Sequence, residues 1–277
     1  MRFRIFLAAL LLASASASLL RAQASAASAS APLAIGETFT FDSRALAERR
    51  RINVFLPPGY ADDTATRYPV LYMPDGGVGE DFVHVAGLVQ VSVGNGTMRP
   101  FILVGIENTE RRRDMTGPTT VASDRRIAPR VGGSAPFRDF VRDELMPRIR
   151  ERYRTTAERA IVGESLAGLF VVETFFVEPA LFDTYIAFDP SLWWNDGALV
   201  RGARERLGTL AVAGRTLYIA SSRDGGLEPL LRQLSPTLER ARGLRWVHRP
   251  MPKETHATIY HPAALDAFRA LFAPPSR

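Results

Sequence analysis

A serine in a glycine-rich turn is the feature of this sequence that most clearly indicates chemistry. Residues Gly163 to Gly168 read Gly-Glu-Ser-Leu-Ala-Gly, with Ser165 at the third position. The turn follows a short apolar run that ends at Val162 and precedes the mostly apolar stretch 169–176, which contains no helix breaker. A serine between a buried strand and a helix is held in a strained backbone with its hydroxyl exposed, which suits a nucleophile. The alternative is a polar residue in the first turn of a helix.

Serine is a weak nucleophile on its own and needs a base, usually a histidine that is oriented by a carboxylate. His256 lies on the predicted loop between the last strand and the last helix, which is where a base for Ser165 is expected. The other three histidines are interpreted as structural. They lie on a predicted helix, within a predicted strand and at the start of the last helix, and are His84, His248 and His261.

The carboxylate that orients the base should lie between Ser165 and His256 in chain order. Asp224 directly follows the predicted strand 216–220 and is the expected acid. Glu228, one helical turn later, is its rival. Either carboxylate could instead stabilise the N-terminus of the following helix through the helix dipole.

Backbone N–H groups are needed to hold the oxyanion that forms when a serine attacks an ester. We expect one donor from Leu166, the residue after the serine. The other should come from Gly77, in the Asp-Gly-Gly turn that follows the predicted strand 69–73. Glycine allows a close approach of the backbone, although an ordinary tight turn would explain the same residues.

Two further groups of residues could contact a substrate. Arg111, Arg112 and Arg113 follow a predicted strand within a long polar stretch and could bind an anionic or catecholate-like group. A solvated run of charges is the alternative for these arginines. Trp193 and Trp194 could wall an acyl or aromatic pocket, and we expect at least one of them to be buried against the core.

Composition excludes several kinds of site. The chain has 277 residues, 46% of them hydrophobic, which is enough for a sizeable core. It has no cysteine, which excludes disulfides, thiolate metal sites and a cysteine nucleophile. The net charge of +6 comes from arginines spread along the chain without a nucleic-acid-binding motif. We therefore expect a small-molecule substrate, no nucleic-acid partner, and neither a metal nor a cofactor.

The N-terminus is typical of an export signal. Residues 1–24 combine a basic start, an apolar run too short to span a bilayer, and an Ala-Gln-Ala sequence that suits cleavage. Residues 25–34 would then form a flexible mature N-terminus, and residues 35–277 a single catalytic domain. This predicts a bacterial periplasmic or secreted protein without stable membrane insertion after cleavage. An uncleaved membrane anchor is the alternative.

The alternation of short apolar strands with helical stretches predicts the fold that positions these residues. The expected strands are 38–41, 51–56, 69–73, 101–106, 159–162, 185–188, 216–220 and 244–248. The expected helices are 81–91, 137–153 with a kink at Pro147, a stretch after the serine turn, 227–241 and 262–272. This order predicts an α/β fold with a mostly parallel sheet and helices on both faces. Ligands gather at the carboxyl ends of such strands, where the predicted site residues fall.

Four segments together resemble the esterase D and enterochelin-esterase-like branch of the α/β-hydrolases, in the expected order over roughly residues 35–273. They read Tyr72-Met-Pro-Asp-Gly-Gly, Gly-Glu-Ser165-Leu-Ala-Gly-Leu-Phe, Pro190-Ser-Leu-Trp-Trp-Asn and Glu254-Thr-His256-Ala-Thr. That branch commonly has His-Ser-Leu-Gly-Gly around its nucleophile, whereas here Glu164 and Ala167 replace the histidine and one glycine. The first replacement could alter the electrostatics beside the serine.

The resemblance implies an α/β-hydrolase fold and a serine carboxylic-ester hydrolase that works through an acyl-enzyme. By resemblance, Ser165 is the nucleophile, His256 the base, and Gly77 and Leu166 the oxyanion donors, whereas the position of the acid is less regular in this family. Members include siderophore trilactone esterases, feruloyl esterases and mycolyltransferases. The alternatives are an acyltransferase that uses the same residues and a non-catalytic binding module, against which the intact Ser–acid–His order argues.

Overall fold

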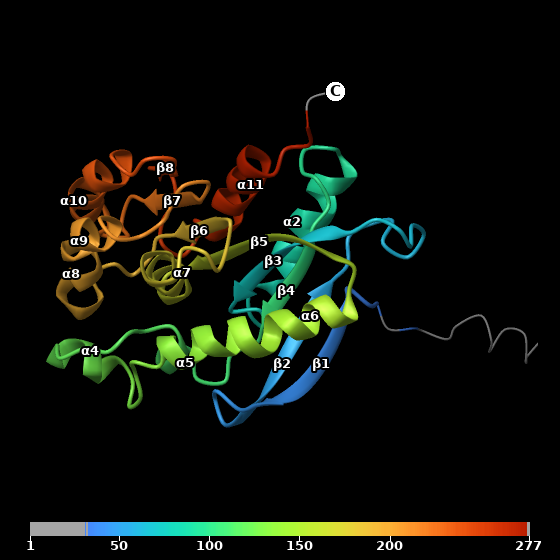
Figure 1. Cartoon of the computed structure of the whole chain (residues 1–277), viewed down its shortest axis with the longest axis horizontal. Helices are drawn as coiled ribbons and strands as arrows, with labels where there is room; N and C mark the ends of the chain where they lie inside the picture. The colour runs from blue at the N-terminus through green and yellow to red at the C-terminus, as the bar shows by residue number, and fades with distance from the viewer. Residues whose placement is uncertain (1–30, 32, 276–277) are drawn as a thin grey trace, which may run out of the picture. The chain divides into compact units, whose positions relative to one another are not determined.

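A mixed sheet of eight strands forms the centre of the described structure (Figure 1). The computed structural model describes residue 31 and residues 33–275. The predicted signal at residues 1–24 and most of the predicted flexible segment 25–34 lie outside the described residues. Residues Ile35–Arg277 form one compact unit. No helix in the described part of the chain has both the length and the hydropathy that crossing a bilayer requires.

The eight strands pair mostly in parallel. They are β1 (Glu37–Ser43), β2 (Glu48–Phe55), β3 (Tyr68–Pro74), β4 (Ile102–Ile106), β5 (Thr155–Glu164), β6 (Thr184–Phe188), β7 (Thr216–Ser222) and β8 (Arg245–Met251). Their order across the sheet is β1-β2-β4-β3-β5-β6-β7-β8. β2 is antiparallel to both of its neighbours, and every pair from β4 to β8 is parallel. This confirms the predicted α/β fold with a mostly parallel sheet.

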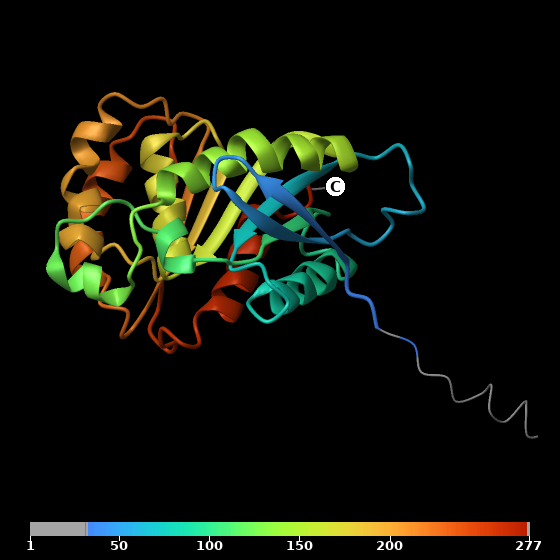
Figure 2. The same ribbon diagram turned by 90° about the horizontal axis from the view of Figure 1, so that it is seen from below.

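Helices cover both faces of this sheet (Figure 2). They are α2 (Phe82–Gly94), α3 (Arg111–Asp114), α4 (Ala122–Ile127), α5 (Ser134–Asp139), the π-helix η1 (Phe140–Leu145), α6 (Met146–Arg152), α7 (Leu166–Val177), α8 (Trp194–Arg201), α9 (Ala203–Leu207), α10 (Glu228–Glu239) and α11 (Tyr260–Leu271). α2 and α11 pack on one face, whereas α5, η1, α6 and α7 pack on the other.

Strands in the middle of the sheet are buried on both faces. Every residue of β3, β4 and β6 is buried, which explains why these segments read as unbroken apolar runs. Alternate residues of β5 point to opposite layers. Ile161 joins the core beside α7, whereas Ala160 and Val162 join the core beside α2 and α11. Both layers therefore fix the end of β5, the point at which the chain turns into Ser165.

Residues 137–153, which were predicted to form one helix with a kink at Pro147, are divided by a π-helical turn. A π-helical turn, η1, separates α5 from α6, and Pro147 lies in the first turn of α6. Proline has no N–H to donate, and its ring would collide with the carbonyl four residues earlier. A wider turn before the proline avoids that collision. The buried side chains of Phe140, Leu145 and Ile149 keep the whole segment against the sheet.

Candidate active site

Ser165 lies on the turn that joins β5 to α7, with a backbone φ of 60° and ψ of −119°. A positive φ is strained for a non-glycine residue. Three backbone hydrogen bonds hold this turn. Ser165 N–H donates to the Phe188 carbonyl at 3.0 Å, and its carbonyl accepts from Ser191 at 3.0 Å and Leu169 at 2.9 Å. The strained conformation is therefore anchored to the end of β6, as the predicted strand-to-helix turn requires.

Ala167, which stands where the usual motif has a glycine, fits into this turn. A Cβ added at Gly163 would lie 2.8 Å from the carbonyl carbon and from the Cβ of Ala167. Only glycine therefore fits at position 163, and its missing side chain leaves room for the methyl group of Ala167. A Cβ added at Gly168 would lie 3.1 Å from the Cα of Pro190. The turn thus needs its small residues because its own backbone and the segment after β6 pack against it.

His256 lies in the turn between β8 and α11, as predicted, and its ring reaches the serine. His256 Nε2 is 3.2 Å from Ser165 Oγ. The histidine side chain is 47% exposed, so a substrate can approach this pair of residues from solvent. Two residues that are separated by 91 positions are brought together because both follow the carboxyl ends of parallel strands.

The carboxylate that faces the ring of His256 is Asp189. Its Oδ2 lies 3.3 Å from His256 Nδ1, and its side chain is completely buried. Asp189 directly follows β6, and Ser222 at the end of β7 donates its backbone N–H to Oδ1 at 2.7 Å and its hydroxyl to Oδ2. The sequence signal for this residue was present, since Asp189 follows a predicted strand and lies between the serine and the histidine.

Asp224, the acid expected from the sequence, contacts the backbone of His256 instead of its ring. Asp224 Oδ1 accepts from the His256 backbone N–H at 2.8 Å and from the Ser222 hydroxyl at 3.1 Å. Its position past the end of β7, in an exposed turn, places it beside the His256 main chain. Glu228, the rival, begins α10 and lies 3.6 Å from Arg232. The geometry thus replaces Asp224 with Asp189 as the ring partner.

The environment favours an ionised Asp189 beside a basic His256. Burial raises the pKa of Asp189, but the hydrogen bonds with His256 and Ser222 outweigh burial and lower it. The hydrogen bond to Asp189 raises the pKa of His256, against the opposing effect of burial, and the charge of Glu164 raises it further. The pair therefore stabilises an imidazolium, which is the state of a base that has accepted a proton.

Gly225 gives a test of the Asp189 position that replaces none of the catalytic side chains. A Cβ at Gly225 would lie 2.7 Å from the carboxylate carbon of Asp189. We expect Gly225→Ala to displace that carboxylate and to lower kcat for ester hydrolysis by about 100-fold, the cost of a displacement on the order of 1 Å. The matched control is Gly87→Ala in α2, where an added Cβ meets nothing within 4 Å. Equal kcat values for the two variants would contradict the placement.

The two predicted oxyanion donors differ in their surroundings. Leu166 is the first residue of α7, where a backbone N–H has no partner within the helix. The N–H of Gly77 donates to Glu80 Oε2 at 2.6 Å, so this donor becomes available only when Glu80 moves. The Asp-Gly-Gly turn does approach another backbone closely, as predicted, but that backbone belongs to strand β4 of the sheet. A Cβ at Gly76 would lie 2.2 Å from the backbone nitrogen of Ile106.

Two of the three arginines predicted to overhang the site are engaged in ion pairs. Arg111 donates to the buried carboxylate of Asp75 through Nε at 2.7 Å and Nη2 at 2.8 Å, a geometry with two parallel hydrogen bonds. Asn108 donates to the same carboxylate at 2.5 Å. Arg111 therefore anchors the turn that carries Gly77. Arg112 donates to the carbonyl of a residue at the end of α4, at 2.8 Å.

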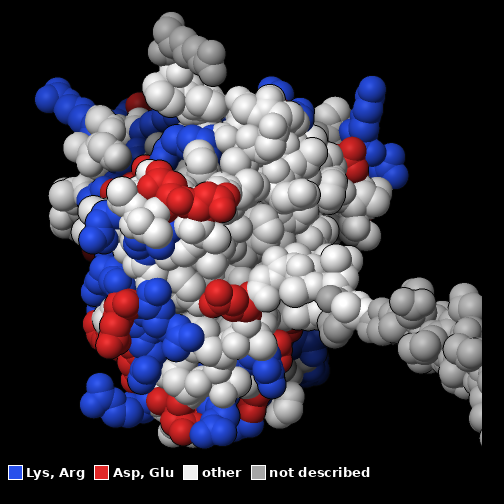
Figure 3. Space-filling view, turned by 90° about the vertical axis from the view of Figure 1, so that its right-hand side faces the viewer, with Lys and Arg blue, Asp and Glu red and all other residues white. Residues whose placement is uncertain are grey.

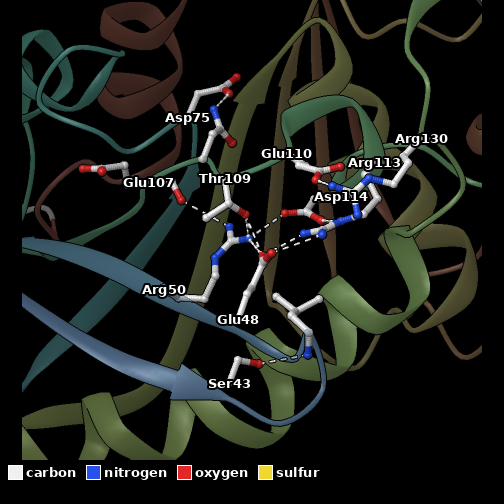
Figure 4. Close-up of polar contacts among 12 residues, drawn as sticks. Ser43, Glu48, Arg50, Asp75, Glu107, Thr109, Glu110, Arg113, Asp114 and Arg130 are labelled. Carbon is white, nitrogen blue, oxygen red and sulfur yellow. Dashed lines mark hydrogen bonds and ion pairs between the residues drawn. The ribbon is translucent and has the colours of Figure 1, made fainter.

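Arg113 belongs to a buried ionic network that ties α3 to β2 (Figure 4). Arg113 contacts Glu48 at 2.7 Å and Asp114 at 2.6 Å. Arg50, fully buried, contacts the same two carboxylates at 2.7 Å each. Carboxylates from distant parts of the sequence thus bind Arg111 and Arg113. A cavity of about 510 Å³ remains beside this run, lined by Glu110, Arg111, Arg112, Arg113, Ala128, Pro129 and Arg130.

Of the two tryptophans, Trp194 is buried and Trp193 is exposed. Trp194 is 4% exposed, and its indole N–H donates to the carbonyl of Gly117 at 2.8 Å. It forms part of the wall of a cavity of about 170 Å³ together with Leu169 of α7. Trp193 is 44% exposed. Trp194 therefore packs against the core, whereas Trp193 is exposed to solvent.

Charged side chains of both signs are interspersed on the face seen in Figure 3, beside a broad uncharged area. Within residues 33–275, no group of three or more His, Asp or Glu side chains is arranged to hold a metal ion. His248 lies in β8 as predicted, with Nε2 2.9 Å from the Ser221 hydroxyl.

The chain matches a protein-family model and several curated relatives. The Esterase family model matches residues 43–262. The chain is 32% identical over 168 residues to the ferri-bacillibactin esterase BesA of Bacillus subtilis (strain 168), and 34% identical over 107 residues to the siderophore triacetylfusarinine C esterase of Aspergillus fumigatus. These matches cover 53% and 37% of this chain, but only 56% and 35% of the two relatives' own lengths.

A solved structure extends the similarity over most of the chain. The IroE-like serine hydrolase from Shewanella oneidensis superposes on this structure with a TM-score of 0.77 at 30% sequence identity. The superposition covers 86% of this chain and 80% of that protein. The arrangement of the sheet and its helices is thus shared with a serine hydrolase along most of both chains.

Proposed function

The chain belongs to the Esterase family of α/β-hydrolases, and from this premise we propose that it hydrolyses carboxylic esters through an acyl-enzyme on Ser165. The observation that carries the proposal is a continuous line of contacts. Ser165 Oγ lies 3.2 Å from His256 Nε2, and His256 Nδ1 lies 3.3 Å from the buried Asp189 carboxylate. Nucleophile, base and orienting acid lie within reach of one another in the order that serine catalysis needs.

In the first half of the reaction, Ser165 Oγ attacks the carbonyl carbon of the ester while His256 Nε2 takes the hydroxyl proton. Asp189 holds Nδ1–H and stabilises the imidazolium. The oxyanion is held by the N–H of Leu166 and, once Glu80 has moved away, by that of Gly77. Collapse of the tetrahedral intermediate breaks the C–O bond, and the imidazolium returns its proton to the departing alcohol.

In the second half, His256 takes a proton from a water molecule that attacks the acyl-enzyme. Collapse of this second intermediate releases the carboxylic acid, and the imidazolium returns the proton to Ser165. Asp224 has a supporting role in this proposal. Its hydrogen bond to the His256 backbone at 2.8 Å holds the loop that carries the base.

For the substrate, we propose a compact polyfunctional ester of the siderophore type. The names of the relatives motivate this class, since one is a ferri-bacillibactin esterase and the other a siderophore triacetylfusarinine C esterase. The cavity beside Arg112, whose guanidinium donates to a backbone carbonyl, gives anionic groups of such a ligand a place to bind. Trp193, exposed next to the segment after β6, offers an aromatic surface. Export through the signal at residues 1–24 remains a prediction from the sequence.

A substrate panel tests the proposed function. It comprises a catecholate trilactone, a feruloyl ester, and short-chain and long-chain nitrophenyl esters, each assayed with and without an added acceptor alcohol. We expect ester hydrolysis with the trilactone among the substrates of highest kcat/KM, and water as the main acceptor. Dominant transfer to the alcohol would replace hydrolase with acyltransferase. A folded protein that cleaves no ester would leave the binding module as the correct function.

A further inference from the structure

A third cavity lies beside the nucleophile, and of its lining residues only His256 takes part in the proposed ester hydrolysis. Its volume is about 320 Å³, and its lining residues are Asp81, His84, Glu164, His256, Ala257, Thr258, Tyr260 and His261. Glu164 directly precedes Ser165, and His256 contacts Ser165 Oγ. The cavity therefore opens beside the atom from which a departing alcohol receives its proton. No arginine or lysine lines this cavity.

The lining of this cavity is rich in hydrogen-bond acceptors. His84 Nε2 lies 3.2 Å from Asp81 Oδ1. Because a carboxylate can only accept, Nε2 carries the proton, and Nδ1 of the neutral ring is an acceptor. Among the described residues, neither His84 Nδ1 nor the Tyr260 hydroxyl has a hydrogen-bond partner, although both atoms are buried. Tyr260 as a whole is only 7% exposed. Buried polar atoms without partners are rare and point to a missing ligand group or water.

The charge around the cavity is negative. Burial and the neighbouring charge of Asp81 raise the pKa of Glu164 to about 7, although His256 and Arg111 oppose the rise. Burial, Asp81 and Glu164 also raise the pKa of Tyr260. Arg111 is the nearby guanidinium, but its two hydrogen bonds go to Asp75. The imidazoles of His84 and His256 are thus the basic groups beside these carboxylates, and neither an arginine nor a lysine side chain lines the cavity.

We propose that this cavity binds a primary ammonium group carried by the alcohol part of the ester. This proposal rests on the proposed ester hydrolysis and adds a specificity-determining site to it. An ammonium group has three N–H donors and no acceptor, which matches the carboxylates of Asp81 and Glu164 and the unpartnered acceptors of His84 and Tyr260. The aromatic face of Tyr260 adds a favourable surface for a cation. A neutral alkyl group would leave those acceptors without partners.

Two esters of the same acid test this proposal, one with a 4-aminobutyl and one with an n-pentyl alcohol part. They have nearly the same shape and differ in whether the chain ends in an ammonium or a methyl group. At pH 8 the amine is charged and Glu164 is mostly ionised. We expect kcat/KM for the aminobutyl ester to exceed that for the pentyl ester by about tenfold, the effect of one hydrogen bond to a charged group. Asp81→Asn should bring the ratio close to one, because it should lower kcat/KM for the aminobutyl ester far more than for the pentyl ester.

Control variants separate this effect from a change in the fold. Glu239→Gln removes an exposed carboxylate from α10 and should keep the wild-type ratio. Tyr260→Phe should lower the ratio without lowering the melting temperature, because it removes a hydroxyl without a partner. Glu164→Gln provides a second charge removal if Asp81→Asn does not fold.

A ratio near one in the wild-type protein, with rapid cleavage of the pentyl ester, would overturn the ammonium site and leave the proposed function intact. If the folded protein cleaves neither ester, the proposed function fails. Calorimetric titration with n-butylammonium then tests the ammonium site independently of ester cleavage. Binding that is weakened about tenfold by Asp81→Asn would support the site. Equal affinity of wild type and variant, or no binding, would overturn it.

Discussion

Replacing Ser165 with alanine is expected to lower kcat for ester hydrolysis by at least ~10³-fold, because only the oxyanion donors and substrate binding remain. The fold should survive, because the turn is held by backbone hydrogen bonds to Phe188, Ser191 and Leu169 that alanine retains. The positive φ at this position is no worse for alanine than for serine. Steady-state kinetics and a thermal melt on the same preparation measure both effects.

Ser235→Ala in α10 is a suitable control, because it removes a serine hydroxyl far along the chain from the active-site residues. A fluorophosphonate probe should label wild type and this control at Ser165, and should not label the Ser165→Ala variant. Wild-type activity or wild-type labelling in Ser165→Ala would show that another residue is the nucleophile.

Asp189→Asn is expected to lower kcat by roughly 10³- to 10⁴-fold, the cost of losing the carboxylate that fixes the histidine tautomer. Asp224→Asn should lower it by less than about tenfold, because an asparagine oxygen can still accept from the His256 backbone N–H. The two variants differ only in which aspartate loses its charge, and each serves as the control for the other. Both should be compared at temperatures well below their melting transitions.

The pH dependence gives this comparison a second readout. His256 must be neutral to take the serine proton, and its pKa is raised by the hydrogen bond to Asp189. In wild type, kcat/KM should therefore fall with decreasing pH at a pH above the ordinary pKa of histidine, about 6.5. In Asp189→Asn that fall should move to lower pH, whereas in Asp224→Asn it should move little. A shift confined to Asp224→Asn would return the role of the acid to Asp224.

The sequence was sufficient to predict the parts of the site that depend on local patterns. The turn around Ser165 has its own signature of small residues between a buried strand and a helix. The loop position of His256 followed from the order of strands and helices. Parallel strands bring such positions to the same edge of a sheet, and in the structure the two side chains lie there, 3.2 Å apart.

The orienting acid depends on side-chain directions that the order of elements does not specify. Asp189 and Asp224 follow neighbouring strands, β6 and β7, and both lie between the serine and the histidine in the chain. Asp189 has a backbone φ of 40° and turns its side chain toward the ring. Asp224 lies on a loop that directs its side chain to the backbone N–H of His256 instead. These differences arise from tertiary packing, such as the contact between Gly225 and Asp189.

The arginines show the same limit of sequence reasoning for charge. Arg111 and Arg113 read as a free basic run because their partners lie far away in the chain. Asp75 is 36 residues from Arg111, and Glu48 is 65 residues from Arg113. Burial of such carboxylates requires a partner with matching geometry, which explains why two of the three arginines became structural. The hydrogen bond from Gly77 to Glu80 and the π-helical turn before Pro147 were likewise beyond pattern reasoning.

The most direct test of the account is mass spectrometry of the protein during turnover of an activated nitrophenyl ester. Nitrophenol leaves readily, so the acyl-enzyme should form faster than it hydrolyses and should accumulate. We expect a burst of nitrophenol together with a mass increase equal to one acyl group, which peptide mapping should place on Ser165. Steady hydrolysis by wild type with no acyl adduct at any time, or with an adduct on another residue, would contradict it.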